Sequence, residues 1–230
     1  MPGKNAIKSY IENGFYHIYN RGVEKRTIFQ DKQDYRVFLH YLKLYLSPPD
    51  KTKGQTVKIN NTIFKTPRRP LNNYHQKLEL LAYCLMPNHF HLLVKQKKSR
   101  TIEFFMRSLL TKYSVYFNKR YDRVGSLFQG PYKAVLVEND NQLLHLSRYI
   151  HLNPYAKDSP LHLAYSSYAD YLGIRKTSWH NSNTILSFFK TAQKTSLKDV
   201  FSYQSFVEQY SKEQISIEEL AIDMDVKENP

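Results

Sequence analysis

The sequence predicts an α+β fold in which a four-stranded antiparallel sheet carries helices on one face, the ferredoxin-like arrangement. Segments typical of strands and of helices follow one another in the order strand, helix, strand, strand, helix, strand. At 230 residues the chain is long enough for one main core with a small appendage. Segments 165–172, 184–191 and 205–210 have the weak pattern of short helices or loops, and they predict an additional peripheral, mostly helical C-terminal layer.

Four segments are predicted as strands from their apolar, aromatic and β-branched residues. The first covers 15–19 and is expected to end at the turn-like Asn20-Arg21-Gly22. Segments 78–85 and 89–95 are joined by a tight Pro87-Asn88 connection, and 132–137 forms the fourth strand. Because 78–85 is almost entirely apolar, we expect it to be a central strand.

Three segments have the apolar spacing of amphipathic helices. The first covers 34–46 and stops at Pro48-Pro49, and the second covers 101–121. The third covers 141–152, with Asn139-Asp140 as its cap and Pro154 after its end. We predict a main domain over 1–172 and a C-terminal helical extension over 173–230.

Residues 48–76 are basic and rich in proline, which indicates an insertion into the main domain. A small hairpin is expected where 56–59 meets 62–65 across Asn60-Asn61. Both a solvated loop and a finger that contacts DNA fit this composition.

The formal net charge of +14 favours a polyanionic partner, most often nucleic acid, with a membrane surface as the weaker alternative. The charge is uneven, because residues 199–230 carry a net −6, which leaves +20 on residues 1–198. Cys84 is the single cysteine, so an internal disulfide is excluded and a reducing compartment is expected. No apolar stretch of about 18 residues is present, so we expect a cytoplasmic protein without a membrane span.

Two short patterns predict a chemical site. His89 and His91 flank one residue of a strand, so both side chains project from the same face and suit a divalent cation. Tyr149 and Asn153 are four residues apart, so they lie side by side if that segment is helical. A cation held by two imidazoles and an amide keeps its full charge for phosphate oxygens, and a tyrosine hydroxyl can then attack the phosphorus.

A structural interpretation of the same residues stays open. A His-x-His pair is frequently part of a core, and Tyr149 is one of 19 tyrosines. Tyr113 and Tyr116 also follow the histidines on a helix, but they lie on its apolar stripe and are better explained as core residues.

Four motifs in order carry a family resemblance: MPNHFHLLV at 86–94, YSVYFNKRY at 113–121, LFQGPYK at 127–133 and RYIHLNP at 148–154. They resemble the single-tyrosine HUH transposases with an IS200-like domain, in the branch of REP-associated tyrosine transposases, and the likeness runs from Phe15 to about Leu172. The resemblance implies the HUH endonuclease fold, with His89, His91 and Asn153 as ligands of Mg²⁺ or Mn²⁺. It also implies that Tyr149 cleaves and rejoins hairpin-bearing single-stranded DNA through a 5′-phosphotyrosine intermediate.

Two rival functions are a domesticated DNA-binding protein of this fold that no longer cuts, and an RNA-binding module. The sequence leaves open a monomer or a homodimer, and the resemblance suggests association with the nucleoid. Candidate phosphate contacts are the basic residues Arg21, Lys95, Lys97, Lys98, Arg100, Lys112, Arg120, Arg123 and Lys133.

Overall fold

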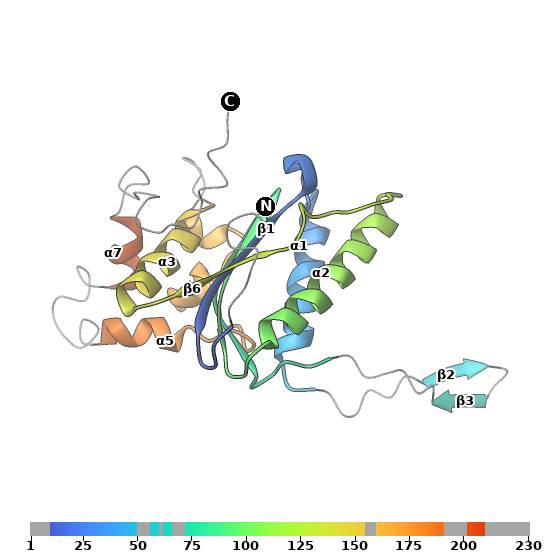
Figure 1. Cartoon of the computed structure of the whole chain (residues 1–230), viewed down its shortest axis with the longest axis horizontal. Helices are drawn as coiled ribbons and strands as arrows, with labels where there is room; N and C mark the ends of the chain where they lie inside the picture. Colours follow the sequence, from blue (N-terminus) through green and yellow to red (C-terminus); the bar gives the residue numbers. More distant parts are fainter. Residues whose placement is uncertain are drawn as a thin grey trace.

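Four antiparallel strands form one sheet in the order β4-β5-β1-β6 (Figure 1). The structure, a computed structural model, describes residues 10–49, 56–59, 62–65, 72–154, 160–190 and 202–209. The strands of the sheet are β1 (Phe15–Arg21), β4 (Leu78–Met86), β5 (His89–Gln96) and β6 (Lys133–Val137).

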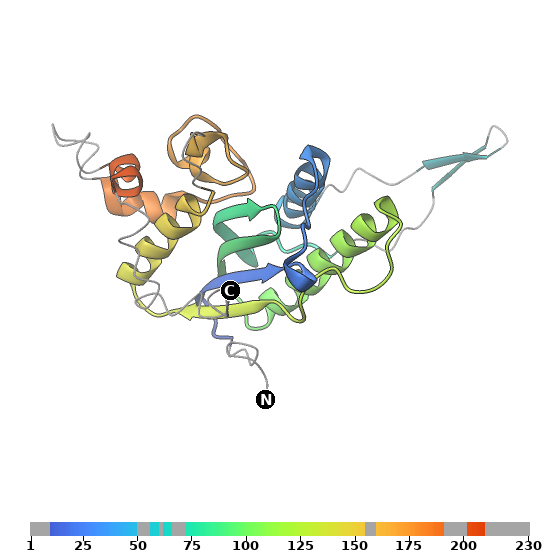
Figure 2. The same ribbon diagram turned by 90° about the horizontal axis from the view of Figure 1, so that it is seen from above.

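Helices α1 (Lys32–Leu46) and α2 (Thr101–Arg120) lie on the same face of the sheet (Figure 2). Both helices are inserted between strands, and they bury a core with that face that includes Ile18, Phe38, Phe90, Phe105 and Leu109. This topology and strand order confirm the predicted ferredoxin-like α+β fold.

Among the strands of the sheet and helices α1, α2 and α3 (Asp140–Leu152), two boundaries differ from the prediction by two residues and the others by one at most. α1 begins two residues earlier than expected, because the Asp31 side chain caps it by accepting from the backbone N–H groups of Gln33 and Asp34. β1 continues through Arg21, which pairs with His89 on β5, so the expected turn at Asn20-Arg21 is wrong. Gly22 is still extended and the chain turns just after it, at Val23–Lys25, so close to Gly22 that an added Cβ there would lie 2.2 Å from the Arg26 carbonyl oxygen.

The opposite face of the sheet is covered by α3 (Asp140–Leu152) and by the C-terminal layer (Figure 2). That layer is made of short elements, as expected: η2 (Leu161–Leu163), α4 (Tyr168–Tyr171), α5 (Asn183–Leu186), η3 (Ser187–Phe189) and α7 (Tyr203–Glu208). A further short turn, η1 (Val23–Lys25), follows β1. The layer is well packed, because Tyr168, Ile185 and Val207 are completely buried.

Strand β4 lies at the edge of the sheet, so the prediction that it is central is wrong. Its apolar sequence has another cause: helices cover both faces, and the chain after α3 covers the open edge. Backbone hydrogen bonds join Tyr165 to Leu85 and Ser167 to Tyr83, and Asn181 bonds to Leu80. An edge strand that is covered in this way is buried as thoroughly as a central one.

The predicted hairpin within the 48–76 insertion is confirmed, with β2 (Thr56–Ile59) and β3 (Thr62–Lys65) pairing antiparallel. Most other residues of the insertion, and the acidic residues of the C-terminal tail beyond 209, lie outside the described residues. The division at residues 172 and 173 stays a prediction. Within the described part, no helix is long and apolar enough to cross a membrane.

His151 joins α3 to the C-terminal layer. Its Nδ1 lies 2.8 Å from the hydroxyl of Tyr203 in α7, and its Nε2 lies 2.7 Å from the hydroxyl of Ser167. The imidazole is fully buried, and this burial lowers its pKa well below the ordinary value of 6.5. The helix that carries Tyr149 is therefore held by a neutral histidine.

This burial predicts acid sensitivity. Below about pH 6.5 the His151 imidazole is protonated in the unfolded chain but stays neutral in the folded protein. The free energy of unfolding should therefore fall as the pH drops below about 6.5. The expected loss from this residue is about 1.4 kcal/mol per pH unit, until the lowered pKa is reached. Urea denaturation at pH 6.5 and 5.5 measures it, with His151→Gln as the control. An equal loss in both proteins would contradict the prediction.

Candidate metal and nucleophile site

The register of the sheet gathers three histidines and a tyrosine on the face that α3 covers. On β5, His89 and His91 project from the same face, as predicted. On β1, Tyr19 lies opposite His91, and His17 lies two residues earlier on the same face. His89 and His91 belong to a sequence motif. His17 and Tyr19 belong to none, and they lie at the site because β1 pairs with β5.

His89 is oriented by its neighbour and faces the end of α3. Its Nδ1 lies 2.6 Å from Oδ1 of Asn88, which can only accept, so Nδ1 carries the proton. Its Nε2 lies 3.3 Å from Oδ1 of Asn153. Two atoms that can act as metal ligands therefore lie close together at the end of α3.

His91 is held by His17. Nδ1 of His91 and Nε2 of His17 lie 2.9 Å apart, and the two rings are nearly parallel with centroids 5.1 Å apart. Burial, followed by the neighbouring histidines, lowers the pKa of His91 well below 6.5. Burial also lowers the pKa of His17 to about 3. Both imidazoles are therefore neutral at pH 7, the form that binds metal ions.

Helix α3 brings Tyr149 over these rings. The helix starts with a reciprocal cap, in which Asn139 accepts from the backbone of Gln142 and the Gln142 side chain accepts from the backbone of Glu138. The Tyr149 ring is half-buried and stands perpendicular to His91, with centroids 5.6 Å apart. The predicted nucleophile and the predicted ligands thus lie at one site.

Asn153 reaches the site because the helix continues to it. Its backbone angles are helical, with φ −53° and ψ −41°, and its N–H donates to the Tyr149 carbonyl at 3.0 Å. A residue before proline normally avoids this conformation, so the sequence alone did not fix its direction. Among the described residues, no three His, Cys, Asp or Glu side chains are placed to bind a metal ion. The third predicted ligand, Asn153, is an amide and so does not belong to such a group.

The predicted basic contacts divide between the two faces of the protein. Arg21 lies opposite His89 and Lys133 lies opposite Tyr19, so these two share the histidine face. Lys112 and Arg120 belong to α2, on the other face of the sheet. The register thus places only part of the predicted set near the site.

Several of these side chains have protein partners. Lys97 forms an ion pair with Glu79, and the Lys95 ammonium lies 5.0 Å from the centroid of the Phe15 ring. Arg120 forms ion pairs with two aspartates and so has a structural role. Arg123 donates to the side chain of Asn118, and Lys98 is exposed in the loop before α2. Contact of these residues with DNA stays a prediction.

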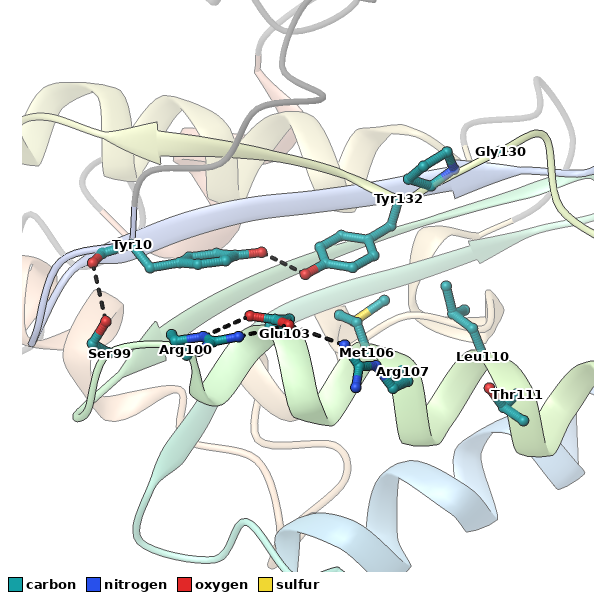
Figure 3. Close-up of a pocket in the computed structure, with 11 residues that line it drawn as sticks. Tyr10, Ser99, Arg100, Glu103, Met106, Arg107, Leu110, Thr111, Gly130 and Tyr132 are labelled. Carbon is teal, nitrogen blue, oxygen red and sulfur yellow. Dashed lines mark hydrogen bonds and ion pairs between the residues drawn. The ribbon is translucent and has the colours of Figure 1, made fainter. Parts of the chain in front are cut away.

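A cavity of about 610 Å³ lies at a separate place, on the α2 side of the sheet (Figure 3). Tyr10 and Tyr132 share a hydrogen bond above it, and Glu103 lies between Arg100 and Arg107 along α2. The cavity contains neither the histidines nor Tyr149. Its lining includes the predicted contact Arg100, whose guanidinium is paired with Glu103.

A family model described as "Transposase IS200 like" matches residues 36–153, just over half of the chain. The chain belongs to the IS200-like transposase family. The match includes the predicted ligands and Tyr149, and it ends at Asn153. Membership of this family implies transposase activity on DNA. No curated protein matches this IS200-like transposase.

Two solved structures are similar to this IS200-like transposase. One is a REP-associated tyrosine transposase bound to a REP hairpin, with 14% identity, a TM-score of 0.49 and coverage of 78% of this chain and 98% of that chain. The other, from Deinococcus radiodurans, is described as a transposase and has 14% identity, a TM-score of 0.36 and coverage of 68% and 100%.

Sequence reasoning missed His17 and Tyr19 as site residues. The only local signal was the alternation of the first strand, which places both on one face. Their proximity to His91 depends on the pairing of β1 with β5, 74 residues apart in the case of His17. That pairing is a property of the fold and is absent from any motif.

Proposed function

We propose that this protein cleaves and rejoins single-stranded DNA that carries a hairpin, with Tyr149 as nucleophile and with a divalent cation, Mg²⁺ or Mn²⁺. The observation that carries the proposal is the convergence of Tyr149, His91, His89 and Asn153 on one face of the sheet. Membership of the IS200-like transposase family supports it.

The side chains at this site fit a divalent cation. Nε2 of His89 and Oδ1 of Asn153, which can both ligate a metal ion, lie 3.3 Å apart. Neighbouring ligands of an octahedral Mg²⁺ with bonds of about 2.1 Å are separated by about 3 Å. His89, His91 and Asn153 would hold the ion, which when bound supplies Lewis-acid stabilisation of the phosphate.

The remaining chemistry belongs to Tyr149. Its hydroxyl oxygen attacks the phosphorus and loses its proton to solvent, and the bond from phosphorus to the 3′ oxygen breaks. The products are a 5′-phosphotyrosine ester and a free 3′-hydroxyl. One phosphodiester replaces another, so the step is nearly balanced in energy and can be reversed onto a different 3′-hydroxyl.

The test uses single-stranded oligonucleotides from the flanks of the gene, labelled at either end and incubated with protein and Mn²⁺. We expect a covalent protein–DNA adduct that survives denaturation and carries the DNA on the 3′ side of the cut. Tight, hairpin-dependent binding without any adduct would support a non-cutting DNA-binding protein instead. Equal competition by RNA would support the RNA-binding alternative.

Metal removal gives a separate prediction. EDTA should abolish the adduct, and His89→Ala should reduce cleavage by about 10²-fold or more, because one of three protein ligands is lost. Excess Mn²⁺ should restore part of the activity of His89→Ala. The matched control is His40→Ala on α1, which changes an imidazole far from the site. Full adduct formation in EDTA would refute a metal-dependent reaction.

A further inference from the structure

His17 has a polar partner on only one side. The residue is completely buried, and its Nε2 lies 2.9 Å from Nδ1 of His91. Its own Nδ1 is buried and has no hydrogen-bond partner among the described residues. The residues opposite His17 on the adjacent strands are the apolar Leu93 and Val135. The side chain therefore makes one hydrogen bond, and that bond goes to a proposed metal ligand.

This environment argues against a purely stabilising role. A buried nitrogen without a partner carries a desolvation penalty, and an apolar side chain of similar size would avoid it. The neighbours Leu93 and Val135 would accept such a side chain. A histidine at this place therefore carries a desolvation penalty, and the hydrogen bond to His91 is the interaction that an apolar residue could not make.

The contact determines which nitrogen of His91 can bind a cation. A neutral imidazole has one N–H and one lone pair. When Nδ1 of His91 donates its proton to Nε2 of His17, Nε2 of His91 keeps its lone pair and becomes a ligand atom. Metal-binding histidines are regularly oriented in this way by an acceptor on their other nitrogen.

His17 also contacts the nucleophile. The Tyr149 ring stands perpendicular to the rings of both His17 and His91, with centroids 6.4 and 5.6 Å away. His17 also stacks on Tyr19, with ring centroids 4.9 Å apart. One buried side chain thus fixes the ligand His91 and forms part of the surface on which Tyr149 rests.

We propose that His17 is a positioning residue, which accepts the Nδ1 proton of His91 and so presents the His91 Nε2 lone pair to a divalent cation. The proposal rests on the proposed function, because it deepens the description of the same site. It assigns to β1 a role in metal binding that no motif of the chain contains.

Two substitutions separate positioning from structural support. His17→Leu removes the acceptor and keeps an apolar volume, while His17→Gln places an amide oxygen close to where Nε2 lies. Mn²⁺ is titrated into each folded variant, and free Mn²⁺ is measured by electron paramagnetic resonance, with and without single-stranded oligonucleotide. Thermal melting of the metal-free proteins is recorded beside it.

We expect His17→Leu to bind Mn²⁺ about 10- to 100-fold more weakly while its melting temperature stays close to that of the wild type, because the unpartnered Nδ1 of His17 is removed and Nδ1 of His91 loses its partner instead. His17→Gln should recover most of the affinity. The control is His180→Gln, a part-buried histidine of the C-terminal layer whose Nε2 lies 2.5 Å from the Leu81 carbonyl oxygen, which should lower stability and leave Mn²⁺ affinity unchanged.

Two results would overturn the inference. One is wild-type Mn²⁺ affinity in His17→Leu, and the other is a lowered melting temperature in that variant together with no recovery in His17→Gln. If the wild-type protein forms the covalent adduct and binds Mn²⁺, either result removes only the role of His17. If the wild-type protein binds no Mn²⁺, the proposed metal site and this inference fail together.

Discussion

Replacing Tyr149 by phenylalanine is expected to abolish the covalent protein–DNA adduct and to reduce strand cleavage by about 10³-fold or more, because the substitution removes the proposed attacking oxygen. Binding of hairpin DNA should persist, since the ring still packs against His17 and His91. Denaturing gels of the labelled oligonucleotides measure the adduct, and a mobility-shift assay measures binding.

A second tyrosine provides the control for this result. Tyr116 on α2 also follows the histidine motif, but its hydroxyl donates to Asp34 at 2.9 Å on the other side of the sheet. Tyr116→Phe should therefore keep the adduct while losing some stability. If the adduct survives in Tyr149→Phe and disappears in Tyr116→Phe, the nucleophile is Tyr116 on α2, and the assignment to Tyr149 on α3 is wrong.

Local periodicity was sufficient to predict most elements. The stripe over 101–121 became α2, and the His-x-His strand became β5, with boundaries within one residue. Tyr113 was predicted as core, and it is fully buried, with its hydroxyl donating to the carbonyl of Ile28 at 2.5 Å. These outcomes depend on which face of an element is apolar, and that information lies within about 20 residues.

Non-local pairing accounts for what the sequence did not predict. β4 was predicted to be central because its sequence is apolar. An apolar sequence is equally typical of a strand between two neighbours and of an edge strand that other elements cover. The closeness of His17 to His91 requires the β1–β5 register. The helical backbone of Asn153 contradicts the preference of a residue before proline, and packing of α3 on the sheet overrides that preference.

The largest loss of stability is expected from Asp34→Ala. The Asp34 carboxylate is completely buried and accepts hydrogen bonds from the backbone N–H of Gln30, from the hydroxyls of Tyr116 and Tyr121, and from Arg120 at 2.7 Å. Removing one partner of a buried, hydrogen-bonded ion pair costs about 3–5 kcal/mol, since the groups that remain keep their desolvation penalty. Urea denaturation measures the free energy of unfolding.

Asp31→Asn is the matched comparison for this substitution. Asp31 also pairs with Arg120, at 2.6 Å, but its side chain is 49% exposed, so the solvent screens the interaction. An asparagine keeps the α1 cap, and the loss should be much smaller than in Asp34→Ala. Similar losses in the two variants would mean that the charge of Arg120 matters more than the burial of Asp34. Because this network ties α1 to α2 on the face opposite Tyr149, folded Asp34→Ala should still form the covalent adduct at low temperature.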